Sequence, residues 1–259
     1  MMRQLFLYIS QRLSEHFNQP IEIRSTKQIF GGDINQTFQL QTNIGSFFLK
    51  LHDDCPADMF EKEFVGLKLL YNTKTVGVPE PILHGNFNNN IFLIIEFIQK
   101  KHPQKNFWKI FAEKLASLHK HSNKQFGLHT DNYIGSLPQQ NTFCDSWAEF
   151  YAIRRIIPLM LKVFEQSRCT KEDVTRVEKL CNGFGELFPK EHPSLIHGDL
   201  WSGNFMSDEN GEPVIFDPAV YYGNREMDIA MSLLFGGFDK TFYDYYGEDF
   251  RFCQTGQKE

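Results

Sequence analysis

Three polar side chains in the last third of the sequence have types and spacing suited to phosphoryl transfer. Asn204 follows Asp199 after four intervening residues, and Asp217 comes next along the chain. An aspartate can orient an attacking hydroxyl group and accept its proton, while carboxylate and amide oxygens are ligands that Mg²⁺ prefers. The pattern therefore predicts Asp199 as the base and Asn204 and Asp217 as metal ligands. A turn that carries these residues by chance is the structural alternative.

A short apolar run precedes each of the two segments that carry these side chains. Leu195-Ile196 precedes His197-Gly198-Asp199, and Val214-Ile215-Phe216 precedes Asp217. Two adjacent strands that ended at one cleft would bring the polar groups together. The spacing Asp-x-x-x-x-Asn is also that of the kinase catalytic loop.

Two neighbours of Asp199 refine this prediction. Gly198 stands where protein kinases have an arginine that often pairs with a phosphorylated activation loop, which favours a small-molecule kinase. We expect His197 to hold the loop by hydrogen bonds rather than to act as an acid or a base.

A lysine far upstream has the placement of a phosphate-binding residue. The run 46–51 alternates as a strand does, which puts Lys50 on the face opposite Leu49 and Leu51. Such a lysine is expected to reach the phosphates of ATP if an acidic partner fixes it. An ordinary surface lysine is the alternative for this residue taken alone.

The predicted helix 58–71 supplies two candidate partners for Lys50. On a helical projection Glu63 lies on the flank that the apolar residues Phe60 and Leu67 share, whereas Glu61 points more toward solvent. Glu63 is therefore the expected partner.

Two further segments could bind a nucleotide. Gly31-Gly32-Asp33-Ile34-Asn35 lies between two predicted strands, where backbone amides can cover phosphates; a plain hairpin turn is an equal alternative. Glu96-Phe97-Ile98 ends a continuous apolar strand where the composition changes. It is expected to be the hinge whose backbone binds adenine, or else a simple linker.

The elements around these residues divide the chain in two. Strands are predicted over 21–29, 38–41, 46–51 and 91–97, with helices over 3–17 and 58–71. From residue 106 helices dominate, over 106–121, 144–166 and 171–188, and Pro158 is expected to kink or divide the second of these. Short strands are predicted over 194–196 and 214–216.

The expected fold class is α+β, in the two-lobed arrangement of protein kinases. An antiparallel sheet with one key helix would form an N-terminal ATP-binding lobe, residues 1–98. A mostly helical catalytic and substrate lobe would follow, residues 99–259.

Composition argues against several other classes of protein, although it leaves a local basic patch open. The chain has 259 residues, of which 41% are hydrophobic and 23% charged, and a net charge of −5. This balance gives no general attraction to nucleic acid or anionic membranes. Neither a signal peptide nor a run long enough to span a bilayer is visible. Five scattered cysteines suggest free thiols, so a cytoplasmic protein is expected.

At this point the sequence resembles the fructosamine kinase family, also called ketosamine kinases, which is related to aminoglycoside phosphotransferases. The resemblance runs from about Gly31 to Tyr246. Its most specific part is the form His-Gly-Asp-Leu-Trp-Ser-Gly-Asn. The segments that carry it are Gly31-Gly32-Asp33-Ile34-Asn35, Phe47-Phe48-Leu49-Lys50, Phe60-Glu61-Lys62-Glu63, Asp131-Asn132-Tyr133-Ile134-Gly135-Ser136-Leu137-Pro138-Gln139, His197-Gly198-Asp199-Leu200-Trp201-Ser202-Gly203-Asn204, Asp217-Pro218-Ala219 and Tyr222-Gly223-Asn224-Arg225-Glu226-Met227-Asp228.

The resemblance implies ATP- and Mg²⁺-dependent phosphorylation of a sugar hydroxyl on ketosamines, the products of amine glycation, as a repair of glycated protein. The ketosamine would be a small molecule or protein-bound. Trp201 would lie against the sugar, whose apolar C–H side suits an indole face; a core tryptophan is the alternative. Asn132 and Arg154 are further substrate-side candidates, although a structural salt bridge would explain Arg154 equally well.

The family pattern also differs from this sequence in one respect. Family members continue with further helices beyond the region 233–238, whereas here a polar tail follows residue 250. The resemblance therefore predicts an incomplete second lobe. An incomplete lobe leaves a nucleotide-binding protein with little catalysis as one alternative. Independently of the lobe, a kinase of another small alcohol, such as an aminoglycoside or choline, is a second alternative.

Overall fold

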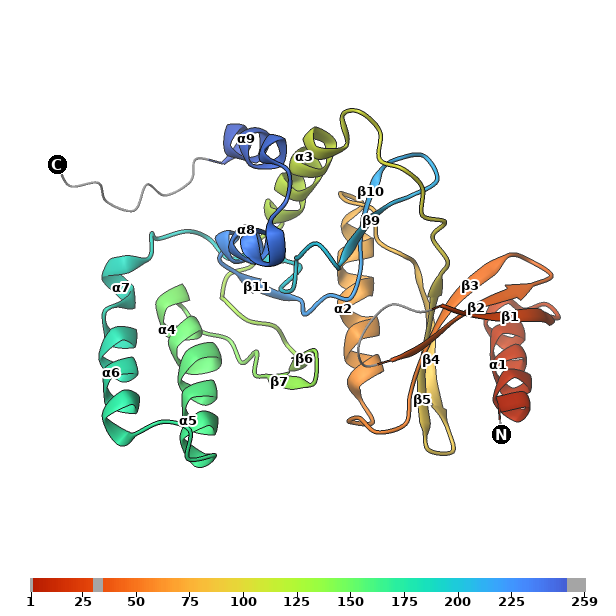
Figure 1. The fold of residues 1–259 in the computed structure, drawn as a ribbon, viewed down its shortest axis with the longest axis horizontal. Coiled ribbons are helices and arrows are strands. Elements are labelled where there is room, and N and C mark those ends of the chain that lie inside the picture. Colours follow the sequence, from red (N-terminus) through yellow and green to blue (C-terminus); the bar gives the residue numbers. More distant parts are fainter. Residues whose placement is uncertain (1, 30–34, 251–259) are drawn as a thin grey trace. The chain divides into compact units, whose positions relative to one another are not determined.

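The computed structural model describes residues 2–29 and 35–250 (Figure 1). The chain divides into two compact units. The first unit comprises Met1–Lys105 and Met206–Asp217, and the second comprises Asn106–Phe205 and Pro218–Glu259. A chain segment from the second half of the sequence therefore completes the first unit. The domain boundary at residue 98 stays a prediction.

The first unit is built on a five-stranded antiparallel sheet with the order β1-β2-β3-β5-β4. Its strands are β1 (Ile23–Ile29), β2 (Gln36–Thr42), β3 (Ser46–His52), β4 (Pro81–Phe87) and β5 (Asn90–Glu96). The tight turn between β2 and β3 passes through Gly45, whose φ of 140° suits a glycine. In β5 every residue of Ile91–Ile95 is buried, as its continuous apolar run predicts.

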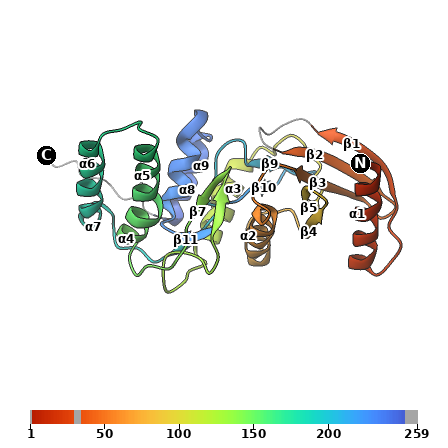
Figure 2. The same cartoon turned by 90° about the horizontal axis from the view of Figure 1, so that it is seen from below.

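Two helices of the first unit cover opposite faces of this sheet, as Figures 1 and 2 show. Helix α1 (Met2–Phe17) buries Leu5, Ile9 and Leu13, which recur at four-residue steps and join the sheet's main apolar core. Helix α2 (Met59–Thr73) packs on the other face, chiefly against β4 and β5. The sheet therefore has an apolar side under α1 and a side under α2 that is available to polar groups.

The second unit is mostly helical. It contains α3 (Phe107–His119), α4 (Trp147–Tyr151), a π-helical stretch (Ala152–Ile156), α5 (Ile157–Glu165), α6 (Lys171–Asn182), α7 (Phe184–Leu187), α8 (Glu226–Leu233) and α9 (Lys240–Asp249). The predicted helix 144–166 is divided as expected, with Pro158 in the first turn of α5, where it needs no hydrogen-bond donor. Short strands β6 (Asn132–Ile134), β7 (Leu137–Gln139), β8 (Ser194–Ile196) and β11 (Tyr221–Gly223) connect the helices.

One expectation about the strands is wrong. The runs 194–196 and 214–216 do not pair with each other: β8 pairs with β11, while β10 (Pro213–Ile215) pairs with β9 (Phe205–Ser207). The sequence shows short apolar runs before polar residues, but the strand partners of such short runs depend on contacts made far away along the chain.

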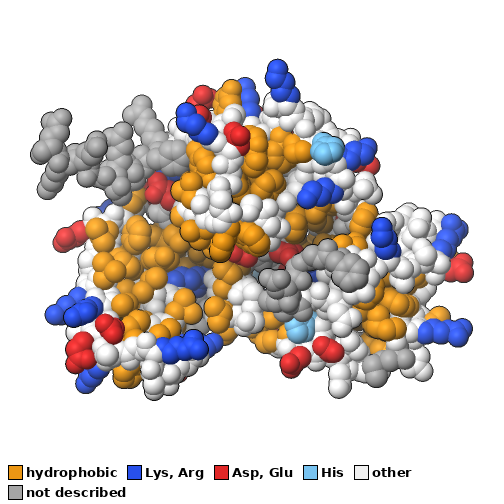
Figure 3. Space-filling model, viewed as in Figure 1, with side chains coloured by type: hydrophobic (Ala, Val, Ile, Leu, Met, Phe, Trp, Pro, Cys, Tyr) orange, Lys and Arg blue, Asp and Glu red, His pale blue; other side chains and the backbone are white. Residues whose placement is uncertain are grey.

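Helix α5 exposes apolar side chains at the surface. Leu159, Leu161 and Phe164 each keep more than two fifths of their surface accessible, and orange side chains gather over this part of the molecule in Figure 3. None of the described helices combines the length and the apolar composition that crossing a bilayer needs. The polar tail that the sequence analysis singled out, 251–259, lies outside the described residues.

Candidate active site

The lysine of β3 lies between two carboxylates of the first unit. Its side chain is only 5% exposed, and its Nζ donates a hydrogen bond to Glu63 Oε1 at 2.7 Å and another to Asp217 Oδ1. Leu49 and Leu51 on either side point into the apolar core under α1, so strand alternation turns Lys50 toward α2, as predicted. The predicted phosphate-binding cation and a predicted metal ligand are thus in direct contact.

Helix α2 explains why Glu63 rather than Glu61 is the partner. Glu63 is 14% exposed at its side chain, whereas Glu61 lies on the exposed side of the helix. Burial by itself would lower the pKa of Lys50, but the charges of Asp217 and Glu63 raise it above its ordinary value. Burial also raises the pKa of Glu63, against the opposing effect of Lys50. Lys50 therefore stays charged at any physiological pH.

Asp217 adopts an unusual backbone conformation. Its φ of 57° lies in the left-handed region, which non-glycine residues enter rarely and often at functional sites. Its side chain is 42% exposed although one oxygen accepts a hydrogen bond from Lys50. The carboxylate is therefore bonded to Lys50 through one oxygen and remains partly accessible to solvent.

The predicted base, Asp199, and the other predicted metal ligand, Asn204, lie in the second unit. Asn204 is buried, and its amide nitrogen donates to the backbone oxygen of Asp199 at 2.8 Å and to Asp199 Oδ2 at 3.0 Å. The loop closes on itself, because Trp201 N donates to Asp199 O and Asn204 N donates to Trp201 O. Since the nitrogen of the Asn204 amide is used within the loop, its carbonyl oxygen is the atom that could bind a metal ion.

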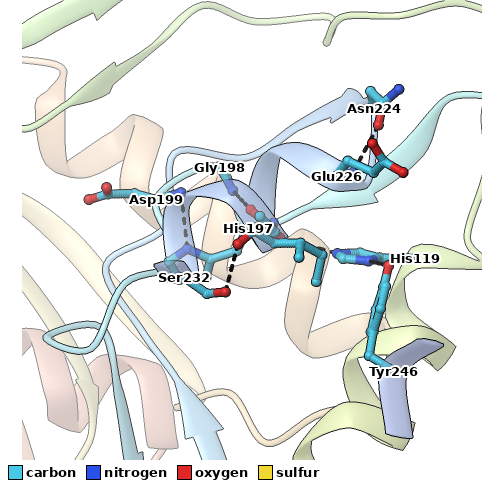
Figure 4. Close-up of polar contacts among 10 residues, drawn as sticks. His119, His197, Gly198, Asp199, Asn224, Glu226, Ser232 and Tyr246 are labelled. Atoms are coloured by element: carbon cyan, nitrogen blue, oxygen red, sulfur yellow. Dashed lines mark hydrogen bonds and ion pairs between the residues drawn. The ribbon is translucent and has the colours of Figure 1, made fainter. Parts of the chain in front are cut away.

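Asp228 binds the backbone of this loop. No role was predicted for this buried aspartate from the sequence. Asp228 is fully buried on α8, and its two oxygens accept hydrogen bonds from His197 N at 2.7 Å and Gly198 N at 2.9 Å. Figure 4 shows the Asp199 side chain pointing away from His119 and Tyr246. His197 is itself buried and its Nδ1 accepts from Asp199 N at 3.2 Å, in agreement with its expected structural role.

Asp228 is also bonded to α3 and, through it, to α9. His119 Nε2 lies 3.2 Å from Asp228 Oδ2, and His119 Nδ1 lies 2.6 Å from the hydroxyl of Tyr246 (Figure 4). All three side chains are essentially inaccessible to solvent. Burial by itself would raise the pKa of Asp228, but the hydrogen bonds from His119 and the backbone lower it below its ordinary value. Asp228 is therefore an ionised acceptor.

Glycine is required beside the predicted base. Gly198 has a φ of 81°, and a Cβ built on it would lie 2.1 Å from the backbone oxygen of Ala219. A side chain at this position would collide with backbone that itself donates to His197 O, at 2.9 Å from Ala219 N. The absence of an arginine here thus has a local steric cause as well as a functional interpretation.

Comparison with known proteins identifies the family. The fructosamine kinase family description matches residues 5–256. The chain belongs to the fructosamine kinase family. A probable ketoamine kinase of Synechocystis is 38% identical over 239 residues, which is 92% of this chain and 80% of that protein. The chloroplastic protein-ribulosamine 3-kinase of Arabidopsis thaliana is also 38% identical, over 87% of this chain and 70% of that protein.

Solved structures place the fold. A proposed fructosamine-3-kinase of Haemophilus somnus superposes with a TM-score of 0.86 and 29% identity, covering 96% of this chain and 85% of that one. An aminoglycoside phosphotransferase in complex with gentamicin superposes with a TM-score of 0.61 at 16% identity, covering 95% and 81%. The second likeness shows the fold alone. The α+β class with kinase-like architecture is therefore confirmed for this fructosamine kinase family member.

The predicted nucleotide-binding loop and hinge are only partly described. Gly31 and Gly32 lie outside the described residues. Glu96 ends β5, where its backbone N donates to Glu80 O at 2.8 Å and its Oε2 accepts from Glu80 N at 3.1 Å. Phe97 and Ile98 follow as half-buried residues without regular structure. Their role as a hinge that binds adenine stays a prediction.

The substrate-side candidates of the family pattern lie in the second unit. Asn132 is buried, and its amide is engaged at both ends: the nitrogen donates to Val220 O, and the oxygen accepts from Asn141. Trp201 is half-buried on the loop of Asp199. Their contact with substrate stays a prediction, and for Asn132 the structure already provides a supporting role in the chain's own hydrogen bonding.

Arg154 and its neighbour Arg155 differ in their surroundings. Arg154 reaches Gln140 Oε1 at 3.4 Å, a long contact. Arg155, which the sequence analysis did not select, donates to Asn141 Oδ1 at 2.6 Å and stacks over the ring of Tyr221 with 4.3 Å between the guanidinium carbon and the ring centroid. Both sit in the π-helical stretch, a conformation found often at functional sites. The sequence offers one indication that Arg155 makes such contacts: it follows Arg154 directly after an aromatic helix face.

Proposed function

We propose that this chain is an ATP- and Mg²⁺-dependent ketosamine kinase, which transfers a phosphoryl group to a sugar hydroxyl of glycated amines. The observation that carries the proposal is the bonded pair of Asp199 and Asn204 in a chain that matches the fructosamine kinase family over residues 5–256. An aspartate held in this way by an asparagine is the arrangement expected of a phosphoryl-transfer loop.

The cation of Lys50 supports nucleotide binding. Its charge is maintained by Glu63 and Asp217, and Glu63 fixes the ammonium group from the helix side. A fixed and desolvated ammonium group is suited to the phosphates of ATP, because it can neutralise them without first ordering a flexible side chain. Glu96, Phe97 and Ile98 are proposed to present backbone groups to adenine, and Gly31 and Gly32 to cover the phosphates.

The oxygen atoms of Asn204 and Asp217 suit a magnesium ion. Asn204 would offer its amide oxygen, because its amide nitrogen is bonded within the loop. Asp217 would offer a carboxylate whose side chain is 42% exposed. The described residues contain no group of three or more His, Cys, Asp or Glu side chains that could hold a metal. A dedicated protein cage is not needed, because Mg²⁺ in kinases keeps waters and binds substrate phosphates beside one or two protein ligands. When bound, the ion would neutralise charge on the transferred phosphate.

Asp199 is proposed to act on the sugar hydroxyl. Asn204 Nδ2 donates to one of its carboxylate oxygens, and the side chain points away from the buried His119 and Tyr246 (Figure 4). A carboxylate fixed in this way can accept the hydroxyl proton as the oxygen attacks, which orients the nucleophile as well as activating it.

The substrate class comes from the relatives. Those compared are named ketoamine kinase and protein-ribulosamine 3-kinase. We propose that this chain likewise takes ketosamines, small or protein-bound, with Trp201 against the sugar, and so serves deglycation repair. Asn132 and Arg154 would contribute on the substrate side. We also propose a cytoplasmic location, for which the support is that the four cysteines within the described ranges are free thiols.

A panel assay tests the function. The purified chain is incubated with ATP and Mg²⁺ and with ribulosamine and fructosamine adducts of lysine, while kanamycin, gentamicin and choline serve as controls. We expect phosphate transfer to the ketosamines and little to the controls. Efficient transfer to an aminoglycoside or to choline, with none to any ketosamine, would refute the substrate assignment, and no transfer to any alcohol would refute the kinase assignment.

A further inference from the structure

The loop after α8 carries the most exposed large apolar side chain in the described ranges. Phe235 is 75% exposed, and Leu233 and Leu234 before it are 59% and 50% exposed. Three consecutive exposed apolar residues are unfavourable in water unless something covers them in use. This segment therefore needs an explanation that packing among residues 2–29 and 35–250 does not supply.

The backbone of Phe235 is held in a costly conformation. Its φ and ψ of 55° and 36° are left-handed, although phenylalanine is a bulky residue that enters this region rarely. Gly236 and Gly237 follow, with φ of 105° and 75°. The chain turns sharply here, and Phe235 is the residue that this turn presents to solvent. Strain of this kind is concentrated at sites that bind ligands.

The exposed ring contacts the ring of Trp201. The two ring centroids lie 5.4 Å apart with 66° between the planes, an edge-to-face contact. Trp201 is itself fixed, because a Cβ on Gly203 would lie 2.3 Å from its ring, so the indole rests directly on the backbone of its own loop. The loop is the one that carries Asp199, to whose backbone oxygen Trp201 N donates at 3.2 Å.

We infer that Trp201 and Phe235 form an apolar subsite for the alkyl chain of the amine that carries the sugar. The inference rests on the proposed function, which places the sugar hydroxyl at Asp199 and the sugar against Trp201. The amine substituent of a ketosamine continues beyond the sugar, and in a glycated lysine that substituent is a chain of methylene groups. Two aromatic rings at an angle offer an apolar corner for such a chain.

This geometry favours long apolar amines over short ones. Each methylene that leaves water contributes about fourfold in affinity. The gain applies to the ground state and the transition state alike, so it is expected in KM rather than in kcat. The subsite would thus select glycated lysine side chains over the glycated forms of small amines.

The test is a series of ketosamines made from one sugar and the straight-chain amines from methylamine to hexylamine. With the wild-type chain, kcat/KM is expected to rise along the series. With Phe235→Ala the rise should flatten, with a loss of about tenfold for the hexylamine adduct and less than about twofold for the methylamine adduct. Phe235→Tyr, which retains the ring, should keep the wild-type slope.

Two variants control for folding and for exposure. Phe235→Gly suits the left-handed backbone, so it removes the ring in a chain that folds at least as well as wild type, and it should also flatten the series. Leu180→Ala removes a side chain that is 55% exposed on α6, a helix that contributes neither ring, and should leave the series unchanged.

Other outcomes would overturn the inference. An unchanged slope in both Phe235→Ala and Phe235→Gly, or an equal loss for all adducts, would exclude a chain-binding role while leaving the kinase activity intact. A wild-type dimer that Phe235→Ala converts to a monomer in sedimentation would assign the exposed run to contact between copies instead. If the wild-type chain phosphorylates no ketosamine at all, the proposed function fails, and this inference fails with it.

Discussion

At the scale of single residues, the two groups of polar side chains divide the work of the proposed reaction. The Asp199 carboxylate accepts a hydrogen bond from Asn204 in the same loop. Asp199 is proposed to act on the sugar hydroxyl and not to bind the nucleotide. We therefore expect Asp199→Asn to lower the transfer rate by about 10²–10⁴-fold, the usual value of a general base. ATP affinity, measured by calorimetric titration, should stay within about threefold of wild type. A large loss of ATP binding in this variant would contradict the assignment.

The partner of Lys50 can be tested against a neighbour on the same helix. Glu63→Gln removes a carboxylate that bonds to a buried ammonium group at 2.7 Å, whereas Glu61→Gln changes an exposed residue. A hydrogen bond between charged groups contributes about 1.5–3 kcal/mol, so Glu63→Gln should weaken ATP binding by about tenfold or more. Glu61→Gln should bind ATP as the wild-type chain does. Equal affinities for the two variants would show that Glu63 does not position Lys50 for the nucleotide.

At the scale of elements, the turn at Gly198 determines whether the loop can form. Gly198→Ala would place a Cβ 2.1 Å from a backbone oxygen at a φ of 81°, so the turn must move. We expect a loss of about 2–5 kcal/mol in the free energy of unfolding, from left-handed strain and overpacking together. Gly185→Ala on α7 meets nothing within 4 Å and should be neutral or stabilising by up to about 1 kcal/mol. Urea unfolding of both variants measures the difference, and equal stabilities would contradict the steric account.

Helix α9 contributes to the same loop at a distance, through His119. The Tyr246 hydroxyl lies 2.6 Å from His119 Nδ1, and His119 in turn contacts the aspartate that binds the loop amides. Tyr246→Phe should cost about 1 kcal/mol in stability, or about 2–4 °C in Tm, and should lower kcat with KM unchanged, because the loop is held less firmly. Tyr245→Phe, at the preceding residue of α9, is the matched control. A lower Tm with full kcat would limit Tyr246 to a role in stability.

At the scale of the whole molecule, local patterns predicted the local features of the site. Strand alternation turned Lys50 toward α2, and helical periodicity chose Glu63, because each inference uses residues close together in one element. The network of Asp228 could not be predicted in this way. His119 lies 109 residues from Asp228 and 127 from Tyr246 along the chain, and no periodicity connects residues at such distances.

The same limit applies to the division of the chain. The segment Met206–Asp217 belongs to the first unit, although the sequence before and after it belongs to the second. The change of composition near residue 98 is visible in the sequence. The return of β10 to the first unit is not, because it depends on contacts with residues far away along the chain. Asp217 reaches Lys50 only because this segment returns, across 167 residues of sequence.

Gly77 is the position where this return can be tested. Ile215 N donates to Gly77 O at 2.9 Å, and a Cβ on Gly77 would lie 2.7 Å from Pro213 O and 2.9 Å from the side chain of Val214. Gly77→Ala should therefore displace β10 at a cost of about 1–3 kcal/mol, shift Asp217 away from Lys50 and weaken ATP binding. Hydrogen exchange at the Ile215 amide should quicken, whereas Gly185→Ala should leave it unchanged. Faster exchange with unchanged ATP affinity would mean that Asp217 is positioned independently of β10, and unchanged exchange would mean that the chain accommodates the methyl group without releasing the strand.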